Sequence, residues 1–80
     1  MTWSVYLLRC GDGTLYCGIA LEVAARLEQH RAGKGAKYTR GRGPLKLVYS
    51  EACGTRAVAL RRERAIKRLR REAKLRLCGP

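Results

Sequence analysis

The chain has 80 residues, enough for one small domain spanning residues 1–80, and 46% of them are hydrophobic, which excludes a disordered basic tail. Its 18 Lys and Arg residues outnumber 6 Asp and Glu residues, and the formal net charge of +12 indicates a polyanionic partner, nucleic acid first of all. Because no apolar run reaches the roughly 18 residues needed to cross a bilayer and no secretory leader opens the chain, we expect a cytoplasmic protein without a membrane partner.

The first 20 residues predict a β-hairpin. Residues 3–9 (WSVYLLR) and 15–19 (LYCGI) are short aromatic and aliphatic runs, and the turn-forming residues CGDGT lie between them. Alternation along each strand places Tyr6 and Tyr16 on one side of the hairpin, where we expect both to face outward. Cys10 and Cys17 are expected to pack as small hydrophobic side chains.

A helix and a basic loop follow the hairpin. From Glu22 to about Ala32 the spacing becomes helical, and a single arc of the helix carries Val23, Leu27, Arg26 and His30. Residues 33–44 (GKGAKYTRGRGP) contain four glycines and four cations, a composition typical of a loop whose backbone approaches a partner closely.

The last part of the chain predicts one strand and two helices. Residues 45–50 (LKLVYS) form the third strand, and Thr55 is the expected N-cap of a helix that runs to about Leu69. Residues 71–77 form a short third helix that Gly79 and Pro80 end. The order β-β-α-β-α-α predicts an α+β fold: a three-stranded, mostly antiparallel sheet flanked by helices. On the second helix, the apolar side is expected to consist of Val58, Ala59, Ala65, Ile66 and Leu69.

The distribution of the cations favours contact with a phosphate backbone. Ten of the 18 lie at or after Arg56, and five more lie between Arg31 and Arg42, so two basic segments are available to hold phosphates. Tyr38, between Lys37 and Arg40, is a candidate for stacking on a base. The alternative for any single Lys or Arg is a solvated helix face that only contributes solubility.

The acids are too scattered for a two-metal nuclease, and the four cysteines form no C-x-x-C pair beside the single histidine, which disfavours zinc. If the protein hydrolyses phosphodiesters, one metal ion with few protein ligands is the chemistry left. Glu63 is the best candidate ligand, because it lies beside Ala59 and Ile66 near the sheet. The residues alone leave a second interpretation open, an ion pair between Glu63 and Lys67 one turn later.

The ordered spacing of five positions carries a resemblance to a known family. The chain has VYL at 5–7, YCG at 16–18, Arg26 eight residues after Gly18, His30 four later, and Glu63 on the following long helix. This set resembles the GIY-YIG nuclease superfamily, and most closely its small single-domain UPF0213 group. The resemblance covers residues 3 to about 77 and implies the GIY-YIG fold.

The resemblance also implies a site and a mechanism. Tyr6, Tyr16, Arg26 and His30 match catalytic positions, and Glu63 matches the ligand of a single Mg²⁺ or Mn²⁺. Arg26 is then expected to stabilise the phosphorane, and Tyr16, Tyr6 or His30 to orient or deprotonate a water, with a nearby cation and the metal lowering the tyrosine pKa. The residues expected to contact the substrate are Gly18, Lys34, Lys37, Tyr38, Arg40, Arg42 and Lys67.

These expectations describe a monomeric endonuclease acting on DNA, single-stranded or branched, as in the incision module of bacterial DNA repair, with RNA as another possible substrate. The chain departs from some relatives in having Ile19 where they have lysine and in containing no asparagine. A nucleic-acid-binding module that keeps the fold without turnover is therefore a second hypothesis. A third is a basic adaptor that binds an acidic protein through its second helix.

Overall fold

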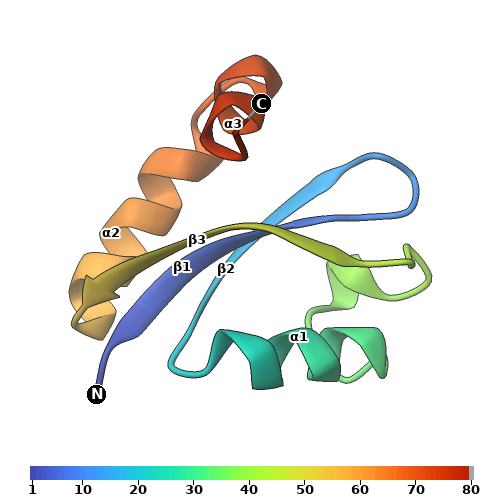
Figure 1. Cartoon of the computed structure of the whole chain (residues 1–80), viewed down its shortest axis with the longest axis horizontal. Coiled ribbons are helices and arrows are strands. Elements are labelled where there is room, and N and C mark those ends of the chain that lie inside the picture. Colours follow the sequence, from blue (N-terminus) through green and yellow to red (C-terminus); the bar gives the residue numbers. More distant parts are fainter. Residues whose placement is uncertain (80) are drawn as a thin grey trace.

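Three strands and three α-helices follow one another in the predicted order in the computed structural model, which describes residues 1–79 (Figure 1). Pro80 lies outside the described residues. The elements are β1 (Trp3–Arg9), β2 (Leu15–Ala20), α1 (Val23–Arg31), β3 (Lys46–Gly54), α2 (Arg56–Lys67) and α3 (Arg71–Leu77), with a short 3₁₀ helix at Lys37–Thr39. Within residues 1–79 no helix combines the length and the apolar character that crossing a membrane requires.

The sheet is antiparallel with the order β2-β1-β3, so β1 is its central strand. Figure 1 shows α1 on one side of the sheet and α2 with α3 on the other. Tyr6 lies opposite Gly18 and Leu8 opposite Tyr16 in the β1–β2 register. The two tyrosines therefore share the face that α1 covers, as the alternation predicts.

Each side of the sheet has its own apolar core. On the α2 side, Val5, Leu7 and Cys17 pack with Ile66. On the α1 side, Tyr6 and Leu8 are buried with partly buried side chains that include Val23 and Leu27. Cys10 and Cys17 are buried free thiols, as expected. Tyr6 does not face outward, because the residues of α1 close over it: only 1% of it is exposed.

Strand β3 continues four residues past its predicted end, to Gly54. Residues 51–54 (EACG) have low strand propensity, but β1 offers them partners, with Val5 opposite Glu51 and Trp3 opposite Gly54. Pairing with a central strand outweighs local propensity, and it places Glu51 and Cys53 inside the sheet.

Helix α2 begins as predicted, because the Val58 backbone N–H donates a hydrogen bond to Thr55 Oγ1 at 3.2 Å. The predicted apolar side of the helix is partly wrong. Ala59 and Ile66 are fully buried, whereas Val58, Ala65 and Leu69 are exposed. The buried face is centred on positions 59 and 66, so the intervening positions 62 and 63 also turn toward the sheet. Glu63 consequently lies partly buried near the sheet, as the sequence predicts.

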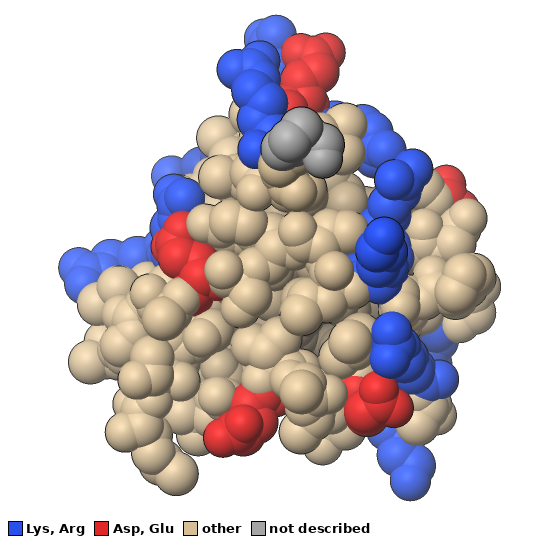
Figure 2. Space-filling view, in the orientation of Figure 1, with Lys and Arg blue, Asp and Glu red and all other residues tan. Residues whose placement is uncertain are grey.

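The surface is strongly basic. Figure 2 shows Lys and Arg side chains around the end of the molecule where α3 lies and down one side, with few acids among them. Most cations of α2 and α3 are exposed, and among the described residues only Arg62 and Lys67 of these helices form ion pairs. Such a surface attracts phosphates at long range.

Candidate active site

Three predicted site residues form an aromatic cluster on the α1 side of the sheet. The His30 ring lies 5.2 Å from the Tyr16 ring and 6.0 Å from the Tyr6 ring, centroid to centroid. Tyr6 Oη and His30 Nε2 are joined by a hydrogen bond of 2.8 Å. The sheet register brings the two tyrosines together, and the buried arc of α1 brings His30 to them.

The lack of a side chain at Gly18 leaves space for this cluster. It lies opposite Tyr6, and a Cβ atom at Gly18 would stand 2.6 Å from Tyr6 Oη and 3.1 Å from Tyr16 Cε2. Any side chain there would displace the Tyr6 ring, because real Cβ contacts are not that short, and would press tightly on Tyr16. The visible role of Gly18 is therefore to let Tyr6 lie across β2.

Arg26 and Glu63 approach Tyr16 from opposite sides of the sheet. Burial raises the pKa of Tyr16, the positive charges of Lys67 and Arg26 lower it, and the charge of Glu63 raises it. Glu63 also raises the pKa of Cys17, the next residue of β2, which faces α2. Because β2 is an edge strand, charged groups of both helical layers act on Tyr16: Arg26 from α1, and Glu63 and Lys67 from α2.

Both members of the buried pair, Tyr6 and His30, have shifted pKa values. Burial, assisted by the nearby Tyr16, raises the pKa of Tyr6 to about 12, although Arg26 acts in the lowering direction. Burial and the positive charge of Arg26 lower the pKa of His30. Desolvation outweighs the charge of Arg26 at Tyr6, so without a bound metal Tyr6 is a phenol and His30 a neutral imidazole at neutral pH.

The basic loop at 33–44 folds back on the site. A Cβ atom at Gly35 would stand 2.3 Å from His30 Nδ1, so the close backbone approach predicted for this loop is made to the histidine. Tyr38 stacks on Tyr16 with centroids 5.7 Å apart, and the Arg42 guanidinium lies 4.3 Å from the centroid of the Tyr38 ring. Tyr38 is exposed at 41%, and stacking on a base stays a prediction for it.

The other predicted substrate contacts divide into two groups. Lys34, Lys37 and Arg40 are exposed on the loop, although Arg40 Nε also donates to the Gly33 carbonyl. Arg42 and Lys67 are engaged within the chain: Arg42 pairs with Asp12 of the hairpin turn, and Lys67 Nζ lies 3.6 Å from Glu63 Oε2.

A family model described as the GIY-YIG catalytic domain matches residues 2–76. The chain belongs to the GIY-YIG family. It is similar to a UPF0213 protein of Staphylococcus aureus strain Mu3, with 52% identity over 73 residues that cover 91% of this chain and 89% of the relative.

Two solved structures agree with this GIY-YIG assignment. A UPF0213 protein from Bacillus halodurans, solved by solution NMR, is 44% identical with a TM-score of 0.63, over 100% of this chain and 89% of that one. A protein from E. faecalis, also solved by NMR, is 38% identical with a TM-score of 0.63, over 92% and 79% of the two chains. The predicted family and fold are confirmed.

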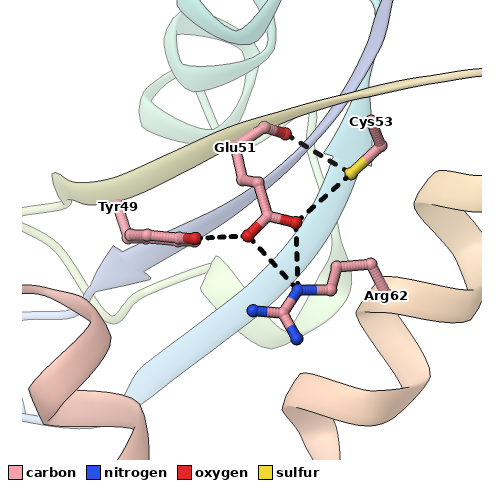
Figure 3. A network of polar contacts seen from close by, with 4 residues as sticks. All are labelled: Tyr49, Glu51, Cys53 and Arg62. Atoms are coloured by element: carbon pink, nitrogen blue, oxygen red, sulfur yellow. Dashed lines mark hydrogen bonds and ion pairs between the residues drawn. The ribbon is translucent and has the colours of Figure 1, made fainter.

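A polar network orients the helix that carries Glu63 in this GIY-YIG fold (Figure 3). Arg62 Nε donates to both carboxylate oxygens of Glu51, at 3.2 and 3.0 Å, and the Tyr49 hydroxyl donates to Glu51 Oε1 at 2.5 Å. The network holds Arg62 toward β3. Successive helix residues are about 100° apart, so Glu63 turns toward β2, and its arginine neighbour does not pair with it.

Glu51→Gln tests this network through pH. Hydrogen bonds from Tyr49 and Arg62 hold the pKa of Glu51 below its ordinary value of 4.5 in the folded protein, so the charged network stabilises the fold above that pH. This stabilisation is lost as pH falls through the lowered folded-state pKa. Urea unfolding from pH 7 to 3 should show wild type more stable than Glu51→Gln at pH 7, with the gap closing in acid. Exposed Glu72→Gln is the control, and a gap independent of pH would contradict the role of Glu51.

The donor set fits one hard divalent cation. Within residues 1–79 no three His, Cys, Asp or Glu side chains cluster, and Glu63 keeps 17% of its side chain exposed. Mg²⁺ commonly keeps several waters and accepts one or two carboxylates together with substrate phosphates. Among the described residues, the only ion pair of Glu63 is the one with exposed Lys67. Such a pair is weak enough to be replaced by a metal cation.

Sequence reasoning missed three residues of the GIY-YIG site. Thr39 contacts His30, Gly35 packs on the same ring, and Asp12 holds Arg42 over Tyr38. The glycine-rich composition indicated a close approach but not its target. No sequence signal links Asp12 to Arg42, because 30 residues separate them.

Proposed function

We propose that this protein is a cytoplasmic, single-domain and monomeric endonuclease that hydrolyses DNA phosphodiester bonds with a divalent metal. The observation that carries the proposal is the cluster of Tyr6, Tyr16 and His30, with the charges of Arg26 on α1 and Glu63 on α2 both acting on Tyr16. Membership of a family whose model describes a catalytic domain supports it. Glu63 would hold the Mg²⁺ or Mn²⁺ ion, which supplies Lewis-acid polarisation of the phosphate and a more acidic bound water.

The residues around the proposed metal position have different roles. Arg26 is placed to stabilise the charge that develops on the phosphate oxygens, an effect that grows in a site from which water is partly excluded. Tyr16 is only partly buried, whereas Tyr6 and His30 are almost completely buried. We therefore assign the contact with the attacking water to Tyr16 and leave Tyr6 and His30 as the supporting pair behind it.

The substrate is proposed to be single-stranded or branched DNA. Three cations of the loop beside the site, Lys34, Lys37 and Arg40, are exposed, and such side chains contact phosphates and not base edges. Tyr38, which contacts Tyr16 and Arg42, remains a candidate for stacking on an unpaired base. Few side chains are left to contact base edges in a duplex. Binding through the phosphate backbone of the nucleic acid suits unpaired strands.

Replacing Lys37 and Arg40 together by alanine should flatten the salt dependence of DNA binding. For a single strand each lost phosphate contact reduces the slope of log K against log salt by about 0.7, so a reduction of about 1.4 is expected. The measurement is fluorescence anisotropy with labelled DNA and EDTA across a salt series. Arg9→Ala with Lys46→Ala is the matched control, because both are exposed and border a hollow on the α3 side of the sheet. An unchanged slope in the loop variant would place the phosphate track elsewhere.

The proposed activity is tested with labelled single-stranded DNA, forked DNA and RNA, each incubated with Mg²⁺, Mn²⁺ or EDTA. Cleavage of a DNA substrate that needs the metal supports the nuclease. Cleavage of RNA alone would overturn the assignment to DNA. Binding without cutting under every metal would instead establish a nucleic-acid-binding module. That second hypothesis rests on the absence of asparagine and on Ile19.

A further inference from the structure

The loop at 33–44 contacts His30 on its Nδ1 side. Thr39 Oγ1 lies 2.9 Å from Nδ1, and both residues are buried, with 2% of each exposed. Gly35 packs so closely that a Cβ atom there would lie 2.3 Å from Nδ1. The ring therefore has one position, fixed by residues that the family motif does not include.

The hydroxyl proton of Thr39 determines which nitrogen of His30 carries hydrogen. Thr39 Oγ1 also lies 2.9 Å from the Ala36 carbonyl oxygen. A carbonyl only accepts, so this bond uses the single proton of the hydroxyl. Thr39 Oγ1 is then an acceptor toward His30, and Nδ1 must be the donor. The Ala36 N–H reaches Nδ1 only at 3.4 Å, a contact too long to compete with two bonds of 2.9 Å.

The other end of the ring leads to the same assignment. With the hydrogen on Nδ1, Nε2 accepts the Tyr6 hydroxyl proton across 2.8 Å. The Tyr6 Oη lone pairs then remain free to accept, an arrangement that the positive charge of Arg26 acting on this hydroxyl favours. With the hydrogen on Nε2, Tyr6 would have to turn its own proton away from His30, toward the side where the guanidinium lies.

We propose that Thr39 is a positioning residue: by accepting from His30 Nδ1–H it fixes the tautomer of His30, which directs the Tyr6 hydroxyl proton inward and leaves Tyr6 Oη as an acceptor for Arg26. The tautomer itself is independent of catalysis. Its effect on turnover rests on the proposed nuclease function, because Arg26 is the group that meets the phosphate. A misplacement of the order of 1 Å in such a group costs roughly 100-fold in rate.

The tautomer is measured directly by ¹⁵N–¹H NMR of the ring. His30 is the only histidine of the chain, so its signals need no assignment by mutation. At neutral pH we expect a protonated Nδ1 and an unprotonated Nε2 in wild type and in Thr39→Ser, which keeps the hydroxyl. Thr39→Val keeps the shape but removes the acceptor, so signal from the Nε2–H tautomer should appear. Thr2→Val, at an exposed position before β1, is the matched control.

The cleavage assay separates the positioning role from the nuclease proposal. Thr39→Val should lower kcat roughly 100-fold with KM unchanged, and Thr39→Ser should restore it. A wild-type spectrum with hydrogen on Nε2 overturns the proposal, even if Thr39→Val does not fold. So does a tautomer shift without loss of kcat. If the wild type shows Nδ1–H but cuts no DNA, the tautomer assignment stands and the nuclease proposal fails.

Discussion

Glu63→Gln is expected to lower metal-dependent DNA cleavage by about 1000-fold while DNA binding in EDTA stays at the wild-type level. The substitution keeps the size of the side chain but replaces the only carboxylate at the site by an amide, a much weaker ligand for a hard cation. The fold should survive, because the one ion pair lost, with exposed Lys67 at 3.6 Å, is of a kind that contributes about 0.3 to 0.5 kcal/mol. The measurement is single-turnover cleavage beside anisotropy binding.

Two control variants decide what Glu63 does. Glu72→Gln on α3 changes the net charge by the same amount at an exposed position and should cut normally. Lys67→Met removes the ion pair but leaves the carboxylate. If Glu63 served only that pair, Lys67→Met and Glu63→Gln would behave alike. The metal role requires Lys67→Met to keep its cleavage at saturating DNA.

Arg26→Ala is expected to lower kcat by at least about 100-fold, because one preorganised donor at the developing charge is lost. Arg64→Ala is the matched control: Arg64 is exposed on the outer face of α2 and should affect binding alone. Nearly unchanged cleavage by Arg26→Ala would reduce Arg26 to a helix-edge residue bonded to Gln29.

Arg26→Ala also has a readout that needs no DNA. The charge of Arg26 contributes to lowering the pKa of His30, after burial, so its removal should raise that pKa while burial still holds it below the ordinary value. Following the single histidine by NMR across a pH series measures the change. A His30 pKa that does not move would show that Arg26 lies farther from the ring than the structure places it.

The parts of the fold that the sequence predicted depend on local patterns. Alternation in residues 3–9 and 15–19 placed Tyr6 and Tyr16 on one face, and Thr55 was identified as an N-cap from its own side chain. The spacing from Gly18 to Arg26 and His30, which carried the resemblance to the family, is also a local pattern. Residues that sit on the same two adjacent elements keep their relative positions wherever those elements form.

The wrong predictions concern partners that are distant in sequence. Strand β3 runs to Gly54 because β1 pairs with it, and Val58 and Leu69 stay exposed because α2 docks through Ala59 and Ile66. Tyr6 was expected to face outward, but α1 covers it. In each case the deciding contact is absent from the local pattern.

The sequence by itself therefore determined the order of the elements and the basic surface, because charge and periodicity are properties of short segments, and the ordered motif spacing carried the resemblance that named the family and the five candidate residues. Only the tertiary structure decided the protonation of Tyr6 and His30, the direction of Glu63 and the role of the loop at 33–44. Burial and hydrogen-bond partners set these properties, and both exist only after distant segments have packed together.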